Sequence, residues 1–234
     1  MEGRLITKTL LPEHGAAFEV TLLQVESAAR GVLFAAGAGG NPLRYRGLLQ
    51  SFAAQGISVI APHFERLASS IPTKADLLER SRRASQALTA YRAAYMSVAG
   101  VGHSVGTVIL LMQAGAEAST FAGDRLTLKG GQPLDRLVLL APPTDFFRHS
   151  GSLASVSIPI QIWVGSKDTV TSSTQAVFLQ ETLEQQTETD LHIVENAGHF
   201  TFMDELPPHI TETHPDRNEF LLSLGREVSC FLLA

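Results

Sequence analysis

The sequence has little of what marks disulfide-rich, membrane-spanning or disordered proteins. Only one of its 234 residues is cysteine, which excludes a disulfide scaffold. No apolar run approaches the roughly 18 residues that a membrane span requires, and charged residues interrupt the first 30 positions, so no secretory signal is expected. Because 44% of the residues are hydrophobic, intrinsic disorder is excluded as well. We therefore expect a soluble, cytoplasmic protein.

The charge balance and the missing motifs narrow the classes of partner and cofactor. The net charge of −5, from 18 basic and 23 acidic residues, argues against nucleic acid or an anionic membrane as the main partner. The chain lacks a complete G-x-G-x-x-G fingerprint, a P-loop, an H-E-x-x-H motif and paired cysteines. Neither a nucleotide cofactor nor a metal is therefore expected. The single cysteine, Cys230, is expected to pack on a helix face rather than to react.

Short apolar runs alternate with helical patterns from about residue 30 onward. The patterns predict strands at 31–36, 57–61, 97–103, 137–141, 158–164 and 191–194, and helices at 42–55, 75–95, 105–116, 173–186 and from Pro215 onward. This alternation indicates βαβ units, a mostly parallel sheet and helices on both of its faces. No linker interrupts the pattern, so residues 1–234 are expected to form one domain.

Two segments stand outside the alternating pattern. Residues 4–10 and 18–24 flank a turn-rich stretch and are expected to add an antiparallel hairpin to the edge of the sheet. Residues 117–135, rich in glycine and charge, are interpreted as a surface loop or a small insertion.

The most specific motif is G-H-S-V-G at residues 102–106. This G-x-S-x-G follows a predicted strand and opens a predicted helix, which is the strand–turn–helix arrangement of a nucleophile elbow. The turn is too tight for a Cβ atom on either side of the serine, and this explains the two glycines. Ser104 is therefore the predicted nucleophile, with a helix-capping serine as the structural alternative. His103 belongs to the motif, but neighbouring side chains diverge in such a turn, so it is not expected to reach Ser104.

A serine nucleophile needs a base, and the base needs a carboxylate to orient it. His199, in N-A-G-H-F just after the last predicted strand, is the first candidate for the base, and His63 is its rival. Asp168, directly after the strand at 158–164, is the first candidate for the acid, and Asp145 is the second. The order serine, aspartate, histidine along the chain is that of the α/β-hydrolases.

Acyl transfer also requires two amides to hold the developing oxyanion. We expect one from Val105, which follows the nucleophile, and the second from Ala38 in the glycine-rich loop at 37–41.

A substrate pocket is expected beside the nucleophile. Its predicted lining is His63, Phe64, Phe146 and Phe147, the last two lying in the segment 143–153.

These motifs resemble the α/β-hydrolase superfamily, and more narrowly its dienelactone-hydrolase-like and acetylhydrolase-like branch, over nearly the whole chain. The stretches that carry the resemblance are 30–34 with 39–41, 48–62, 102–106 and 197–200. The resemblance implies an α/β-hydrolase fold and a Ser-His-Asp hydrolase that needs no cofactor.

Some positions depart from this family's pattern. Dienelactone hydrolase proper has a cysteine nucleophile where this chain has Ser104, so a dienelactone substrate is not inferred. Ala36 replaces a histidine that relatives usually carry before the first glycine of the oxyanion loop, and His63 replaces an aspartate. The stretch between 141 and 158 is too short for the helical cap of many lipases, so we expect an open cleft.

The sequence therefore predicts a serine hydrolase that cleaves a small, soluble carboxylic ester through an acyl-enzyme intermediate. Thioesters, lactones, amides and peptides fit the same triad, and a hydrolase-fold binding protein without turnover is the alternative from another class. The apolar face of the last helix fits either its own sheet or a partner, which leaves the oligomeric state open.

Overall fold

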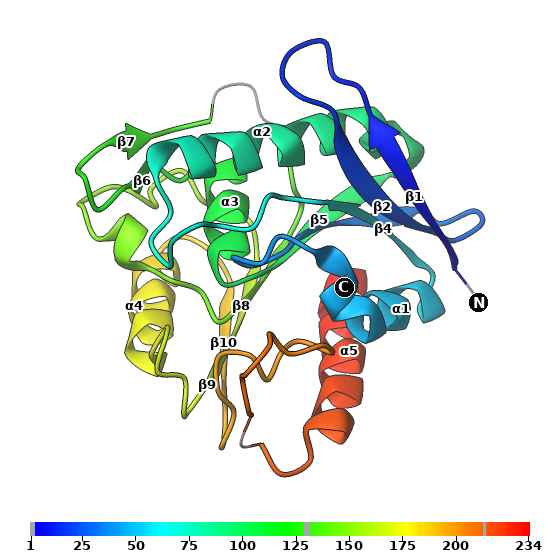
Figure 1. Cartoon of the computed structure of the whole chain (residues 1–234). Coiled ribbons are helices and arrows are strands. Elements are labelled where there is room, and N and C mark those ends of the chain that lie inside the picture. Colours follow the sequence, from blue (N-terminus) through cyan, green and yellow to red (C-terminus); the bar gives the residue numbers. More distant parts are fainter. Residues whose placement is uncertain (1–2, 129–131, 213) are drawn as a thin grey trace.

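A computed structural model describes residues 3–128, 132–212 and 214–234 of the chain. Within these residues the central feature is an eight-stranded sheet in the order β1-β2-β4-β3-β5-β8-β9-β10 (Figure 1). The bounds are β1 Arg4–Leu10, β2 Phe18–Gln24, β3 Arg30–Ala35, β4 Ile57–Pro62, β5 Ser97–His103, β8 Leu137–Leu140, β9 Ile160–Gly165 and β10 Thr189–Val194. From β4 to β10 all neighbouring strands are parallel. The predicted mostly parallel α/β sheet is therefore confirmed.

The helices lie on both faces of the sheet, as predicted. Helix α1 (Arg46–Ala54) packs on α5 (Arg217–Leu233) on one face, whereas α2 (Lys74–Tyr91) and α3 (Val105–Gln113) pack together on the other (Figure 1). Helix α4 (Ser173–Leu183) contacts the last two strands. The apolar face of α5 is thus covered by α1 of its own chain.

The N-terminal hairpin lies at the edge of the sheet. Strand β2 pairs antiparallel with both β1 and β4, and the observed bounds equal the predicted ones. The segment interpreted as a loop or small insertion contains a short antiparallel ribbon, β6 (Ala118–Ser119) with β7 (Arg125–Leu126). Residues 129–131 of that segment lie outside the described residues.

Helix ends are where the sequence pattern and the structure differ most. The predicted helix at 42–55 is divided into the 3₁₀ turn η1 (Pro42–Tyr45) and α1, and Gly56 follows with φ of 82°, the left-handed conformation typical of that position. The last helix begins at Arg217 instead of Pro215, after Asp216. A second 3₁₀ turn, η2 (Arg92–Ala94), follows α2.

The prediction that Cys230 packs on a helix face is wrong. Cys230 is exposed, whereas Leu224, Val228 and Leu232 form the buried stripe of α5. Two residues along an α-helix correspond to a turn of about 200°, which directs Cys230 away from the side that Val228 faces.

The segment between β8 and β9 holds only the 3₁₀ turn η3 (Asp145–Phe147), so the described residues form no large cap. Nor does any helix in the described ranges combine the length and the apolar character needed to cross a bilayer.

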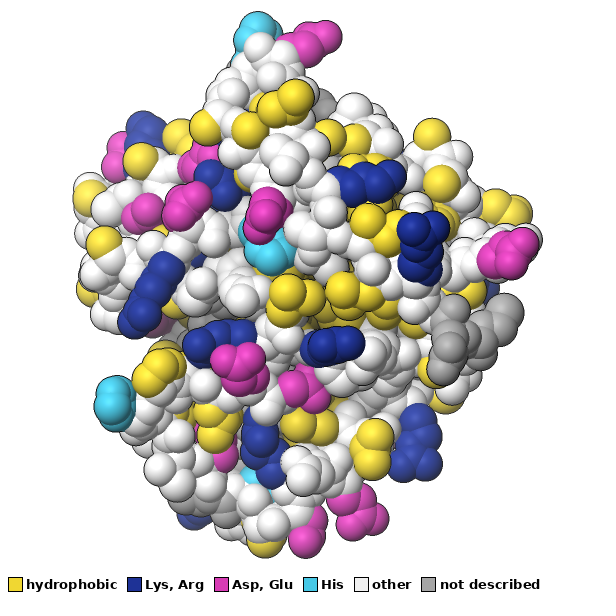
Figure 2. Space-filling model, turned by 45° about the vertical axis from the view of Figure 1, so that its right-hand side comes forward, with side chains coloured by type: hydrophobic (Ala, Val, Ile, Leu, Met, Phe, Trp, Pro, Cys, Tyr) yellow, Lys and Arg dark blue, Asp and Glu magenta, His cyan; other side chains and the backbone are white. Residues whose placement is uncertain are grey.

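On the face shown in Figure 2, basic and acidic side chains are interspersed rather than gathered by sign. That face therefore offers no continuous positive stripe to a phosphate backbone.

Candidate active site

Ser104 occupies a sharp turn between β5 and α3. Its φ of 53° and ψ of −130° lie in a region that non-glycine residues rarely adopt. A Cβ atom at Gly106 would come within 2.0 Å of the Ala35 carbonyl oxygen, and one at Gly102 within 3.0 Å of the Gly106 carbonyl carbon. The glycines flanking the serine are thus required by close backbone approach, for the reason that the sequence motif suggests.

The structure brings the first candidates for nucleophile, base and acid together. Ser104 Oγ lies 3.0 Å from His199 Nε2, and His199 Nδ1 lies 2.9 Å from Asp168 Oδ2. The Asp168 and His199 side chains are 0% and 5% exposed. In this arrangement the imidazole Nδ1–H donates to the carboxylate, which leaves Nε2 free to accept the serine proton.

Asp168 is held by more groups than the sequence indicated. Its Oδ1 accepts hydrogen bonds from the Val170 and Thr171 amides at 2.8 and 2.7 Å, and its Oδ2 accepts one from the Thr171 hydroxyl at 2.9 Å. Burial acts to raise the pKa of Asp168, but the bonds from His199 and Thr171 outweigh it and the pKa is lowered. The carboxylate therefore stays ionised beside the imidazole.

Thr171 is a residue that sequence reasoning missed. Its hydroxyl lies 3.1 Å from His199 Nδ1 and 2.9 Å from Asp168 Oδ2, so it contacts both the candidate base and the candidate acid. An aspartate followed by two residues and a threonine after a strand is a local turn signal, and it indicates the hydrogen bond between Asp168 and Thr171.

The loop after β3 lies directly against Ser104, the candidate nucleophile. A Cβ atom at Gly37 would be 3.3 Å from the Ser104 Cβ atom. Residues 37 to 40 form a turn in which the Gly40 amide donates to the Gly37 carbonyl at 3.0 Å. Among the described residues, the amides of Ala38 and Val105 donate to no protein acceptor. The structure therefore leaves both predicted oxyanion donors without a protein acceptor in the described ranges.

The chain is similar in structure to several hydrolases. No protein-family model and no curated protein matches the sequence. A dienelactone hydrolase from Anabaena variabilis is 17% identical, with 100% of this chain and 98% of that chain covered and a TM-score of 0.69. A predicted CIB-like hydrolase from Thermoplasma acidophilum is 16% identical, with 97% of this chain and 99% of that chain covered and a TM-score of 0.67. A thermophilic esterase, Est2, from Thermogutta terrifontis is 14% identical, with 99% and 91% covered and a TM-score of 0.68.

The chain has the α/β-hydrolase fold. The predicted resemblance to dienelactone-hydrolase-like proteins is confirmed at this level, because such a structure superimposes over the whole chain. In the α/β-hydrolase fold seen here, the three candidate catalytic side chains all follow the carboxyl ends of strands β5, β9 and β10. This is the edge at which open parallel sheets bind ligands.

The second candidates for base and acid are placed elsewhere in the hydrolase fold. His63 Nε2 lies 2.8 Å from the Thr21 hydroxyl of β2, which directs the ring toward the hairpin. Burial lowers the pKa of His63, and nearby Glu19 opposes this effect. Asp145 pairs with Arg148 at 3.4 Å on the surface. Neither residue has a hydrogen bond to Ser104 or His199 among the described contacts.

The aromatic residues predicted to line the substrate pocket are all buried. Phe146 and Phe147 are 3% and 1% exposed and belong to the hydrophobic core, where Phe146 packs edge-to-face on Phe121. Phe64 is also buried, with the Arg80 guanidinium 5.1 Å from its ring centre. Their part in substrate binding, like that of His63, stays a prediction.

His103 has a role that the motif did not reveal. The Tyr45 hydroxyl lies 2.8 Å from its Nδ1, and its Nε2 lies 2.8 Å from the His199 carbonyl oxygen. Because a carbonyl only accepts, Nε2–H is the donor and Nδ1 accepts the tyrosine proton. Burial and the neighbouring His199 lower the pKa of His103 to about 3. A neutral imidazole therefore supports the backbone of the candidate base.

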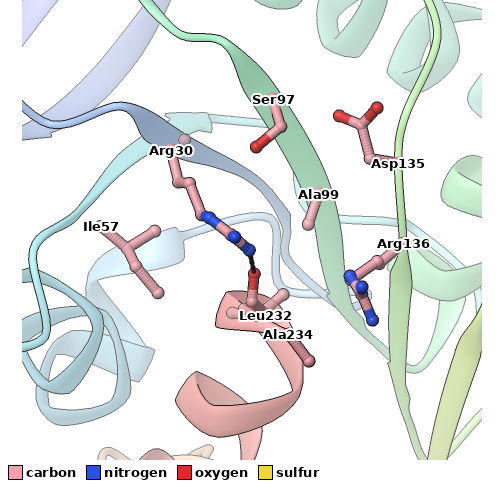
Figure 3. Close-up of a pocket in the computed structure, with 9 residues that line it drawn as sticks. Arg30, Ile57, Ser97, Ala99, Asp135, Arg136, Leu232 and Ala234 are labelled. Carbon is pink, nitrogen blue, oxygen red and sulfur yellow. Dashed lines mark hydrogen bonds between the residues drawn. The ribbon is translucent and has the colours of Figure 1, made fainter.

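A cavity of about 210 Å³ lies at the opposite end of the sheet (Figure 3). Arg30, Ser97 and Arg136 line it at the amino ends of β3, β5 and β8, together with the C-terminal Ala234. Arg30 donates a hydrogen bond to the Leu232 carbonyl there at 2.8 Å. This position separates the cavity from Ser104, which follows the carboxyl end of β5.

Within the described residues, no group of three His, Cys, Asp or Glu side chains is arranged to hold a metal ion.

Proposed function

We propose that the protein is a serine hydrolase that cleaves small carboxylic esters. The observation that carries this proposal is the continuous hydrogen-bonded series from Ser104 Oγ through His199 to Asp168, with distances of 3.0 and 2.9 Å. It is supported by the amides of Ala38 and Val105, which donate to no acceptor among the described residues. Nucleophile, base, orienting acid and oxyanion donors are the complete set that acyl transfer needs.

In the first half of the reaction, Ser104 Oγ attacks the ester carbonyl carbon while His199 Nε2 takes the hydroxyl proton. The carbonyl oxygen becomes an oxyanion that the Ala38 and Val105 amides stabilise. His199 then gives its proton to the leaving alcohol, and the acyl group stays on Ser104. Water repeats the sequence and releases the acid, and Asp168 remains ionised throughout.

The substrate class follows from the surroundings of the triad and from the similar structures. With no large cap over the described site, a small soluble substrate fits better than an interfacial lipid. The similar structures include an esterase and a dienelactone hydrolase, and the serine at position 104 favours ester chemistry of the former kind. A cytoplasmic location and a single-domain organisation of residues 1–234 belong to this proposal as sequence-based predictions.

The test is hydrolysis of p-nitrophenyl acetate and p-nitrophenyl octanoate by the wild type and Ser104→Ala. Ser223→Ala, which removes a hydroxyl from α5, is the matched control. We expect Ser104→Ala to lose activity by at least about a thousandfold, the control to keep it, and a fluorophosphonate probe to label Ser104 only in proteins that retain the serine.

Equal rates for the wild type and Ser104→Ala would refute the proposal. If both rates are at background, the same pair of proteins should be assayed on matched thioesters and anilides. A Ser104-dependent rate there would identify a thioesterase or amidase. Ligand stabilisation without turnover would identify a binding protein.

A further inference from the structure

A buried arginine donates hydrogen bonds to the loop that carries one of the proposed oxyanion donors. Arg80, on α2, is 2% exposed. Its Nη1 lies 2.9 Å from the Gly37 carbonyl oxygen and 3.4 Å from that of Ala36. Its Nη2 lies 3.0 Å from the Ala38 carbonyl oxygen and 2.7 Å from that of Glu65. One guanidinium thus ties three successive peptides of the loop after β3 to the segment after β4.

These contacts fix the direction of the Ala38 amide. In a trans peptide the C=O of one residue and the N–H of the next point in opposite directions. Holding the Gly37 carbonyl on Arg80 therefore turns the Ala38 N–H away from the guanidinium. The Gly40 amide donates to the same Gly37 carbonyl, and the Leu67 amide donates to the Ala38 carbonyl at 2.9 Å. The peptide has little freedom left to rotate.

Arg80 also keeps its positive charge available to the loop. Burial lowers the pKa of Arg80 to about 10, and Asp76 opposes this effect, so the side chain is charged at neutral pH. In the described part of the chain no carboxylate pairs with Arg80, whereas Arg83, one turn further along α2, pairs with Glu79 and Glu65. A cation bound to the Gly37 carbonyl polarises the peptide and makes its N–H a stronger donor.

We propose that Arg80 is a positioning residue of the oxyanion hole, which aims and polarises the Ala38 amide by holding the Gly37 and Ala38 carbonyls. The inference rests on the proposed function. Ala36, the residue before the loop, has no polar side chain with which to anchor it, and Arg80 supplies the anchor from α2. A donor that is fixed before the substrate arrives stabilises the transition state without reorganisation.

The test compares Arg80→Met with Arg83→Met, a matched control in which a second buried arginine of the same helix is removed. The readouts are kcat and KM for p-nitrophenyl acetate and the inhibition constant of an aryl trifluoromethyl ketone. The serine adduct of this ketone carries an oxyanion, so its affinity reports on the hole. We expect Arg80→Met to lower kcat about 10- to 100-fold and to change KM about twofold or less. The inhibition constant of the ketone should rise by the same factor by which kcat falls. Arg83→Met should leave all three values near those of the wild type.

Arg80→Lys provides the test if Arg80→Met does not fold. Its single ammonium keeps the charge but cannot place separate nitrogens on the Gly37 and Ala38 carbonyls. It should show a smaller loss of the same kind, in kcat and ketone affinity rather than in KM. Wild-type kcat and ketone affinity in a folded Arg80 variant would overturn the inference, and so would equal losses in Arg83→Met.

Failure of the inference and failure of the proposed function are distinguishable. If Ser104→Ala is inactive while a folded Arg80 variant is fully active, only the positioning role is wrong. If hydrolysis does not depend on Ser104, the proposed function fails and the positioning role falls with it.

Discussion

Replacing His103 with glutamine should remove a large part of the protein's sensitivity to acid. The imidazole is 1% exposed, and burial lowers its pKa from 6.5 to about 3. Glutamine can still accept a proton from the Tyr45 hydroxyl and donate to the His199 carbonyl, but it does not titrate. The substitution therefore changes proton binding more than it changes the local hydrogen bonds.

The magnitude follows from proton linkage. Below pH 6.5 the unfolded chain binds a proton at His103 that the folded protein does not bind until about pH 3. The free energy of unfolding therefore rises with pH in this window by at most about 1.4 kcal/mol per unit, and this part is lost as the pH falls. Between pH 7 and pH 4 the loss from this residue alone is about 3 kcal/mol.

The assay is urea unfolding at pH 7, 6, 5 and 4 for the wild type, His103→Gln and Tyr45→Phe. His103→Gln should be less stable than the wild type at pH 7, and the difference should shrink by about 3 kcal/mol at pH 4. Tyr45→Phe removes the hydroxyl but keeps the buried imidazole, so its curve should run roughly parallel to that of the wild type. Parallel curves for the wild type and His103→Gln would refute the reasoning, because they would show that His103 is not held neutral.

Further predictions concern the acid and the loop of the base. Asp168→Asn should lower kcat for p-nitrophenyl acetate at pH 7 by about 10⁴-fold, because an amide no longer selects the Nδ1–H tautomer of His199; a loss below tenfold would contradict the triad. Thr171→Val removes the hydroxyl donor to Asp168 but keeps the amide, so the pKa of the Asp168 carboxyl should rise when it is measured by NMR titration of its ¹³Cγ resonance; an unchanged carboxyl pKa would show that the hydroxyl is not a donor to Asp168. Asp204→Ala removes a carboxylate that accepts a hydrogen bond from the Gly47 amide at 2.8 Å and so caps the start of α1. Urea unfolding should show that the free energy of unfolding falls by about 1–2 kcal/mol. An unchanged unfolding midpoint would mean that this cap does not contribute to stability.

Sequence patterns predicted the parts of the structure that depend on local periodicity and chain order. The alternation of apolar runs and helical stretches predicted the parallel sheet and its edge hairpin, since burial of both sheet faces requires nearly continuous apolar strands. Ser104, Asp168 and His199 could be proposed because each directly follows a strand, and parallel strands bring such positions to one edge. The structure does bring the three side chains together.

Residues that act from a distance in the sequence could not be found this way. Arg80 is one of several arginines on α2, and only the packing of α2 shows that its guanidinium contacts the loop after β3. Tyr45 and His103 are 58 positions apart, so their hydrogen bond has no local signature. The burial of Cys230 was predicted wrongly for a different reason, because its apolar neighbours along the chain do not show which side of the helix is covered.

The three candidate catalytic residues lie far apart along the chain, so a ribosome makes them at different times. Ser104 and its elbow are complete once β5 and α3 have emerged, whereas Asp168 and His199 follow β9 and β10 in the last third of the chain. A nascent chain that ends at α4 therefore contains Ser104 and Asp168 but not His199. Under the proposed mechanism, Ser104 therefore gains its base only after β10 has been made, and the onset of Ser104 reactivity would report that this strand has joined the sheet.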